Sequence, residues 1–267
     1  MSAVRPAAVA GMFYPDNAKT LAQDLDGLLA DARPRVFGLV PKALIVPHAG
    51  YIYSGPIAAS AYALLEPLAA TVRRVILLGP THRVAVRGLA LPGTDAFASP
   101  LGIVNIDQDA VRQIAQLPQV TISPQAHALE HSLEVHLPFL QTVLSDFTLL
   151  PLAVGMASAE EVAEVLEAVW GGPETLIVIS SDLSHYLPYD AATVTDSATA
   201  QTILRLEETV THQQACGGTP VNGLIVAARR HGMTPHLLDL RNSGDTAGDK
   251  SRVVGYGAFA FTEAGHD

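Results

Sequence analysis

Three short aliphatic runs constrain the fold of this 267-residue chain more than any other feature. They are Ala43 to Val46, Val75 to Leu78 and Leu176 to Ile179, and each is apolar throughout instead of alternating between apolar and polar residues. Strands that are covered on both faces show this pattern, which is typical of parallel sheets. The runs therefore predict an α/β fold with a mainly parallel central sheet flanked by helices.

Helical patterns occur between these runs and after them. We expect helices over Pro56 to Leu65, Asp107 to Leu117, Ala159 to Trp170, Ala191 to Glu208 and Thr219 to Arg230. Pro56 would then occupy a first turn, where proline is tolerated. Phe147 to Val154 is a further strand, and Val253 to Phe261 is a late strand expected to lie antiparallel at the edge of the sheet. Because no linker, repeat or charge block interrupts the chain, we interpret residues 1–267 as a single domain.

Composition narrows the classes of function. The formal net charge of -10 argues against nucleic-acid binding, which needs clustered cations to neutralise phosphates. Cys216 is the only cysteine, so no internal disulfide can form, and this suits a reducing compartment. No apolar stretch has the length of a membrane span, and the first residues lack a signal-peptide pattern. We therefore expect a cytoplasmic protein without nucleic-acid or membrane partners.

A histidine follows each of the three buried runs. They are His48, His82 and His185, and ligands of open α/β sheets bind at this end of the strands. Neutral imidazole is the commonest metal ligand, so the three positions predict a metal-sized pocket. Asp182 precedes His185 by three residues, where it is a candidate metal ligand, a hydrogen-bond acceptor for an imidazole, or a helix cap.

The segment from His127 to His136 is dense in groups that bind metals. It differs from the zinc-protease motif, in which the two histidines are four residues apart and glutamate follows the first. One helical turn would align Glu130, His131 and Glu134 at the rim of the pocket. The alternative interpretation is a solvated helix face.

Two further positions carry reactive groups. A glycine-punctuated loop over residues 242–251 contains Asp245 and Asp249, either of which would complete the site unless the loop is an ordinary polar turn. We interpret Cys216 as a small buried residue rather than a stabilised thiolate. The chain contains neither the GxxxxGK or GxGxxG nucleotide-binding motifs nor the Gly-x-Ser-x-Gly elbow of serine hydrolases, so both classes are disfavoured.

Several short motifs, taken in order, resemble the Memo family from about residue 5 to residue 261. They are Arg5-Pro6, residues 11–15, 47–51 and 78–82, Glu130-His131-Ser132 with Glu134 and residues 136–138, and Ser180-Ser181-Asp182 with His185. The resemblance implies a fold similar to class III extradiol dioxygenases, which use non-haem ferrous iron to open catechol-type rings. It also implies that the protein takes part in the AmmeMemoRadiSam system. A radical S-adenosylmethionine protein and an AMMECR-type protein would then be its pathway partners.

The resemblance also assigns individual residues. His48 and His82 match metal-ligand positions, and His185 falls where the dioxygenases place an acid/base histidine, with Asp182 beside it. The animal member has a cysteine ligand in the C-terminal loop, where this chain has Thr246, so Asp245 becomes the candidate third ligand. The implied metal is iron(II), with copper and zinc as alternatives.

Three functions follow from these residues. The first is a metal-dependent redox enzyme acting on an unidentified small molecule, in which His48, His82 and Asp245 hold the metal. Its catalytic candidates are His185, Asp182, Glu130 and His131. The second is a non-catalytic partner protein that binds a metal or ligand. The third is a metal hydrolase in which Glu130 or Glu134 activates water.

Overall fold

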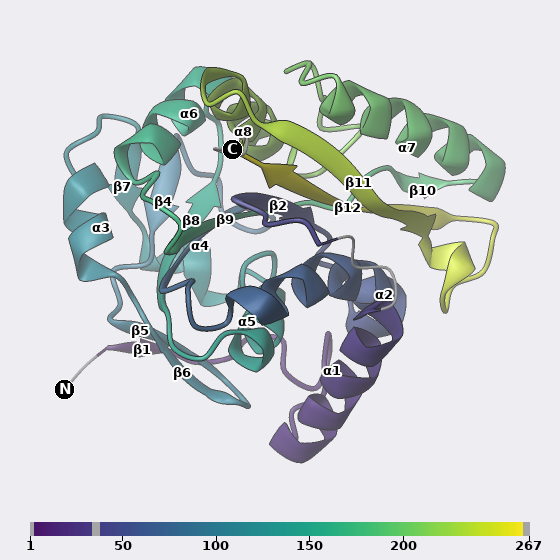
Figure 1. Cartoon of the computed structure of the whole chain (residues 1–267), viewed down its shortest axis with the longest axis horizontal. Helices are drawn as coiled ribbons and strands as arrows, with labels where there is room; N and C mark the ends of the chain where they lie inside the picture. The colour runs from purple at the N-terminus through teal and green to yellow at the C-terminus, as the bar shows by residue number, and fades with distance from the viewer. Residues whose placement is uncertain (1–2, 34–37, 264–267) are drawn as a thin grey trace.

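The computed structural model describes residues 3–33 and 38–263 and contains a nine-stranded sheet (Figure 1). Along the sheet the strands follow the order β10, β12, β2, β9, β3, β8, β4 and β7, and β11 also pairs with β12. Their bounds are β2 (Ala43–Val46), β3 (Arg74–Pro80), β4 (Leu89–Leu91), β7 (Val120–Ile122), β8 (Thr148–Val154), β9 (Thr175–Ser180), β10 (His185–Leu187), β11 (Thr234–Asn242) and β12 (Val253–Thr262). A small separate sheet joins β1 (Val4–Arg5), β5 (Ala96–Ser99) and β6 (Gly102–Asn105).

The centre of the large sheet is parallel. Strands β2, β9, β3 and β8 are neighbours and run in the same direction, whereas β4 and β12 flank them in the opposite direction. Every residue of β2 and β9 is buried, as expected for strands built on continuous aliphatic runs. The predicted α/β class and its central parallel sheet are therefore confirmed.

The late strand lies in the interior of the sheet instead of at its edge. It pairs antiparallel with β2, as expected, but β11 pairs with its other side, and β10 pairs with its first residues. The edge prediction was wrong because β11 mixes charged and apolar residues and has a proline in its second position, so its sequence does not indicate a buried strand.

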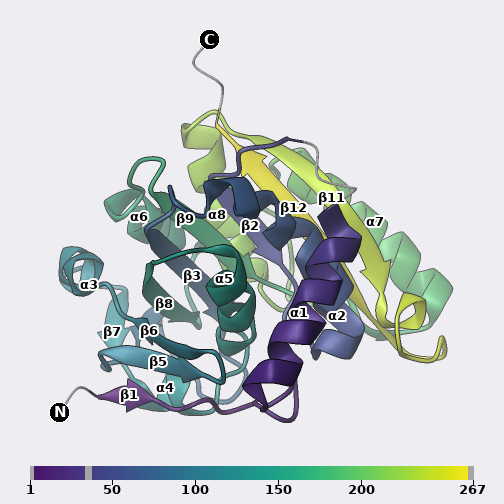
Figure 2. The ribbon, with the colours of Figure 1, turned by 60° about the horizontal axis from the view of Figure 1, so that its bottom comes forward.

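Helices cover both faces of the sheet (Figure 2). The α-helices are α1 (Ala18–Ala32), α2 (Tyr51–Tyr62), α3 (Gln108–Ile114), α4 (Pro124–Ala128), α5 (Leu137–Val143), α6 (Ala159–Ala168), α7 (Tyr189–Leu204) and α8 (Gly218–Arg230), and the 3₁₀ helices are η2 (Ala63–Leu68), η3 (Glu134–His136) and η4 (Ser243–Asp245). Helices α1, α2 and α5 share one hydrophobic core with the sheet, and α3, α6 and α8 share the other. Within the described residues, no helix combines the length and the apolar character that crossing a membrane requires.

Alternation along each strand divides its side chains between these two cores. In β2, Leu44 and Val46 belong to the core of α1 and α2, whereas Ala43 and Ile45 belong to that of α6 and α8. All four are fully buried. Burying one large aliphatic side chain contributes roughly 1.5–3 kcal/mol, so the short central strands are held mainly by packing.

The starts of α2 and α8 differ from the predicted ones. Helix α2 begins at Tyr51, with Gly50 as its N-cap, so Pro56 lies inside the helix and not in its first turn. Helix α8 begins at Gly218, which places the predicted cap residue Thr219 within the first turn. Neither Gly50 nor Gly217, the actual N-caps, forms a side-chain cap, and this is why the sequence gives no sharp start signal there.

Candidate metal centre

The register of the central strands brings three polar loops to one edge of the sheet. Val46 at the end of β2 pairs with Ser180 at the end of β9, and Leu78 of β3 pairs with Ile179 of β9. The loops that begin here carry His48, His82 and the segment 181–185. The predicted meeting of these loops at the carboxyl ends of the strands is therefore what the structure shows.

A triple-histidine group forms at this edge, and its members are His48, His82 and His131. One ring nitrogen of each lies within 4.8 Å of the others, a spacing that permits a shared metal ion. The ring centroids of His82 and His131 are 4.5 Å apart, and those of His48 and His82 are 5.2 Å apart. The structure thus brings His131, for which the sequence suggested a catalytic role, into direct contact with the two predicted ligands.

The Nδ1 atom of each imidazole in the triple-histidine group lies close to a polar partner, and those of His48 and His82 are hydrogen-bonded. His48 Nδ1 lies 2.7 Å from Ser180 Oγ, and His82 Nδ1 lies 2.8 Å from Glu130 Oε1. His131 Nδ1 lies 3.3 Å from the same Glu130 oxygen. The Nε2 atoms are consequently the ones available to a ligand, and partners of this kind fix the tautomer of metal-binding histidines.

Burial keeps two members of the group, His48 and His131, uncharged. It lowers the pKa of His48 well below its usual range, and the neighbouring imidazoles of His131 and His82 add to the effect. Burial, followed by the influence of His82, lowers the pKa of His131 to about 4. Both rings are neutral at pH 7, which is the protonation state that binds a metal.

Glu130 provides the negative charge behind the group. Its carboxylate accepts hydrogen bonds from the backbone N–H groups of His82 at 2.7 Å and of His131 and Ser132 at 2.9 Å. Burial alone would raise its pKa, but these bonds and the His82 side chain hold the pKa of Glu130 at about 2. The carboxylate is therefore ionised and fixed in place.

The predicted helical turn around Glu130 does not form. Residues 129–133 form a non-helical turn between α4 and η3, because Glu130 caps backbone N–H groups with its side chain. Glu134 faces away from the histidines and forms a buried ion pair with Arg5 at 2.6 Å. The solvated-face interpretation was also wrong, since Glu130, Glu134 and His136 are all buried.

Asp182 and His185 lie beside the group, as the sequence indicated. Asp182 Oδ1 accepts the backbone N–H of His48 at 2.7 Å, and its Oδ2 lies 4.0 Å from His48 Nε2. Burial raises the pKa of Asp182 to about 7 and lowers that of His185. Both residues line a cavity of about 770 Å³ that also contains the three histidines of the group.

Cys216 is closer to the site than the sequence suggested. Its Sγ atom lies 3.4 Å from His48 Nε2, although the two residues are 168 positions apart. Gly217 permits this approach, because a Cβ atom there would lie 2.6 Å from the carbonyl oxygen of Ser180. Burial, with the nearby Asp182, raises the pKa of the Cys216 thiol to about 12, so the free protein presents a neutral sulfur donor.

Asp245, the candidate third ligand, lies outside the group. Its carboxylate accepts hydrogen bonds from the Tyr189 hydroxyl at 2.6 Å and from the backbone N–H of Asn242 at 2.9 Å, and it thereby caps η4. Asp249 lines the cavity but is exposed, and its oxygen accepts the backbone N–H of Ser251. The third member of the group is His131.

The donor set fits a divalent transition metal. Three imidazoles converge, a thiol and a carboxylate lie beside His48, and the cavity leaves space for further ligands. Imidazole with sulfur or carboxylate suits iron, copper and zinc, whereas calcium and magnesium prefer oxygen ligands.

Comparison with known proteins matches the chain to one family. The family model described as Memo-like protein matches residues 5–260. A MEMO1 family protein of Aquifex aeolicus is 38% identical over 95% of this chain and 97% of its own length. Another from Sulfolobus acidocaldarius is 35% identical over the same shares. The crystal structure of an uncharacterised Escherichia coli K12 protein shares the fold, with a TM-score of 0.51 and 16% identity over 80% of this chain and 98% of its own.

Proposed function

This chain belongs to the Memo family, and from that premise we propose that it is a non-haem metal-dependent oxidoreductase of dioxygenase type. The observation that carries the proposal is the triple-histidine group, whose rings converge beside a cavity and include hydrogen-bonded Nδ1 atoms on His48 and His82. A ferrous ion, when bound, supplies Lewis-acid and one-electron redox chemistry.

The protein residues would bind the metal, orient its ligands and support the loops that carry them. His48, His82 and His131 would hold the metal through Nε2, while the Glu130 carboxylate orients two of the rings and raises their basicity. Asp182 holds the backbone N–H of His48 and so fixes the loop that follows β2. This support lies on strand ends and short turns, which position ligands more reproducibly than long loops do.

His185 is the proposed acid/base residue. It lines the cavity together with Tyr186 and Tyr256, at the same edge of the sheet as the metal ligands. Its burial keeps the imidazole neutral at pH 7, so it can accept a proton from a hydroxyl group of a substrate. A volume of about 770 Å³ lies within the range of small-molecule sites, and the aromatic wall suits a planar substrate.

The structure favours this proposal over a metal hydrolase. Glu134, one of the two carboxylates considered for activating water, pairs with Arg5 and accepts bonds from Ala8, Val9 and Tyr14. The other, Glu130, is engaged by the rings and backbone of the ligand loops. Neither carboxylate is therefore available to a water molecule in the cavity.

Oxygen uptake tests the proposal. Protein loaded with iron(II) without oxygen would be mixed with a panel of catechols in an oxygen electrode, and we expect consumption that depends on both iron and substrate. His185→Ala should retain the iron but lower kcat by roughly 10²–10⁴-fold. Iron-loaded protein that consumes no oxygen with any catechol would instead favour a non-catalytic ligand-binding role, such as that of a pathway partner.

A further inference from the structure

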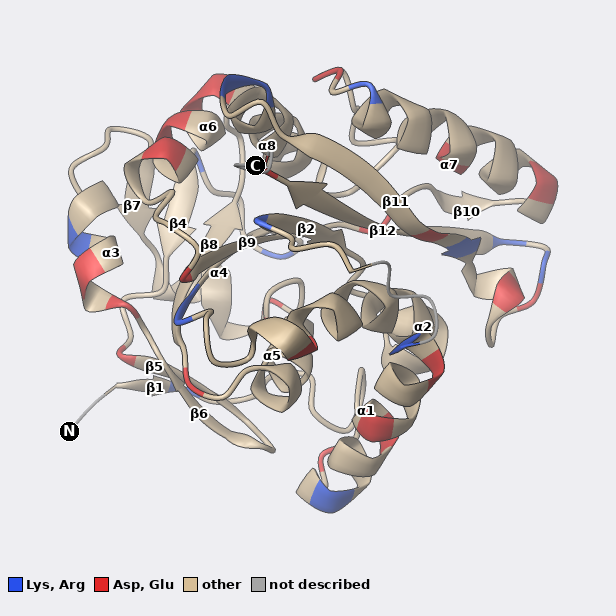
Figure 3. Cartoon of the chain, viewed as in Figure 1, with Lys and Arg blue, Asp and Glu red and all other residues tan. Residues whose placement is uncertain are grey.

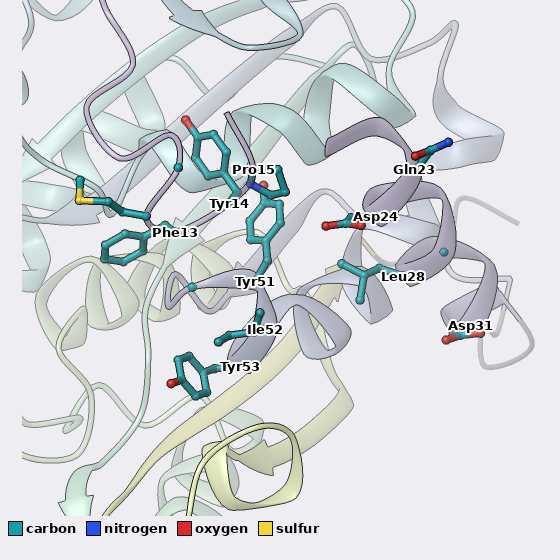
Figure 4. Close-up of a pocket in the computed structure, with 14 residues that line it drawn as sticks. Phe13, Tyr14, Pro15, Gln23, Asp24, Leu28, Asp31, Tyr51, Ile52 and Tyr53 are labelled. Carbon is teal, nitrogen blue, oxygen red and sulfur yellow. The ribbon is translucent and has the colours of Figure 1, made fainter. Parts of the chain in front are cut away.

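A second cavity lies between α1 and the start of α2 (Figure 4). It adjoins the cavity of about 770 Å³ that His48, His82 and His131 line, which we call the metal cavity. The second cavity has a volume of about 590 Å³, and we call it the α1/α2 groove. Residues that define it are Met12, Phe13, Asp24, Leu28, Asp31 and Ile52. The groove shares Phe13, Gly50 and Tyr53 with the metal cavity, so an occupant of the groove would end near the mouth of that cavity.

Exposed apolar side chains line the groove. Met12 is 72% exposed and Ile52 is 68% exposed, which places both among the most exposed large hydrophobic residues of the described chain. Phe13 and Tyr53 add aromatic rings that are partly buried. Large apolar side chains that gather in a concave surface are typical of a binding site.

Two carboxylates form the outer wall. Asp24 and Asp31 are exposed on α1 and lie seven residues apart, which places them on the same side of the helix about 10 Å from each other. Within residues 3–33 and 38–263 neither carboxylate forms an ion pair, and acidic residues recur along α1 (Figure 3). Together with the net charge of -10, this wall attracts a cationic occupant.

No side chain projects from the middle of this wall, because the residue there is Gly27. It lies between the two carboxylates inside α1, where glycine is destabilising relative to alanine. Packing does not demand the glycine, because a Cβ atom at this position would meet nothing within 4 Å. The missing side chain instead widens the groove where an occupant would cross α1.

We propose that the α1/α2 groove binds an extended segment of a partner protein that carries two basic residues three positions apart, with apolar residues or proline between them. A polyproline II segment advances about 3.1 Å per residue with three residues per turn, so such cations lie on one face about 9 Å apart. This spacing matches Asp24 and Asp31. Grooves lined by aromatic side chains recognise segments of this conformation.

Fluorescence anisotropy tests the proposal with a labelled peptide of sequence Gly-Lys-Pro-Leu-Lys-Pro-Gly. We expect saturable binding at low ionic strength that weakens as salt is added. Asp24→Asn combined with Asp31→Asn should weaken binding by about tenfold or more, because both cations lose their partners. Gly27→Leu should abolish binding by filling the groove, while circular dichroism shows a folded protein.

Matched controls lie on the same helix. Asp26→Asn and Ala30→Leu change exposed positions of α1 outside the groove, and they should leave binding unchanged. A peptide with the two lysines adjacent should bind more weakly than the probe. Equal binding of the probe to Gly27→Leu and to wild type, or equal binding of both peptides, would overturn the proposal. Metal-free protein suffices throughout, so the result is independent of the proposed redox activity.

Discussion

At the scale of single residues, Glu130 links the fold to the candidate metal centre. The same carboxylate caps three backbone N–H groups and lies against the Nδ1 atoms of His82 and His131. We predict that Glu130→Gln lowers the affinity for iron(II) or zinc by roughly 10–100-fold, because two ligand rings lose their charged acceptor. Competition with a chromogenic chelator measures this affinity.

Glu167→Gln is the matched control for that substitution. Glu167 also faces a histidine, with its Oε2 atom 2.9 Å from His231 Nε2, but the pair lies away from the cavity. This variant should bind metal as wild type does. A Glu130→Gln protein with unchanged metal affinity would show that the carboxylate serves the fold alone.

His127 makes stability depend on pH. Burial lowers its pKa to about 4, and its Nε2 atom contacts the carbonyl oxygen of Ala90 at 2.7 Å. As pH falls below 6.5 the unfolded chain binds a proton at this residue before the folded protein does, so stability declines until about pH 4. Between pH 7 and pH 5 this one group should cost about 2 kcal/mol.

Urea unfolding at pH 7 and pH 5 checks the contribution of His127. His127→Gln retains a donor for the Ala90 carbonyl oxygen but cannot titrate, so its loss of stability over this range should be smaller by about 2 kcal/mol. The same pH dependence in both proteins would mean that His127 is protonated in the folded state.

The sequence was informative for some site residues and not for others. His48 and His82 follow recognisable buried strands, and parallel register necessarily brings such loops together. His131 reaches them only because Glu130 folds its own turn, and Cys216 only because Gly217 packs against Ser180. Both contacts depend on tertiary structure that has no local signal in the sequence.

At the scale of secondary-structure elements, one buried ion pair ties the N-terminal segment to the loop that carries His131. Arg5 of β1 bonds to Glu134 and to the carbonyl oxygens of His127 and Glu130. Replacing Arg5 with methionine leaves the Glu134 carboxylate buried without its cation. We predict that Arg5→Met lowers the free energy of unfolding by about 3–5 kcal/mol, as measured by urea titration.

Arg205→Met is the control for the ion pair. Arg205 pairs with Glu207 on an exposed surface, where water screens the interaction, so its removal should leave stability unchanged within error. Equal, small effects of the two substitutions would contradict the view that the Arg5 pair anchors this loop.

The central strands were predictable, whereas helix α1 and strand β11 were missed. The central strands each contain a continuous aliphatic run, which is why their predicted bounds lie within two residues of the observed ones. Helix α1 buries Leu21, Leu25 and Leu29 at a helical spacing, but it was not among the predicted helices. Strand β11 was missed because pairing with β12, rather than its own composition, determines its conformation.

At the scale of the whole molecule, two hydrophobic cores hold a parallel sheet whose carboxyl edge carries the histidines. The family resemblance stated from the sequence is confirmed across residues 5–260. Packing beneath the loops supports the strand ends at which His48, His82 and His131 converge. The central claim is that this convergence is a metal site.

Elemental analysis of protein purified without oxygen tests this claim most directly, with wild type compared with a variant that combines His48→Ala and His82→Ala. We predict close to one transition-metal ion per wild-type chain and none in the variant, with both proteins folded by circular dichroism. A folded wild-type protein that contains no metal and takes up none on addition of iron(II), copper or zinc would contradict the account.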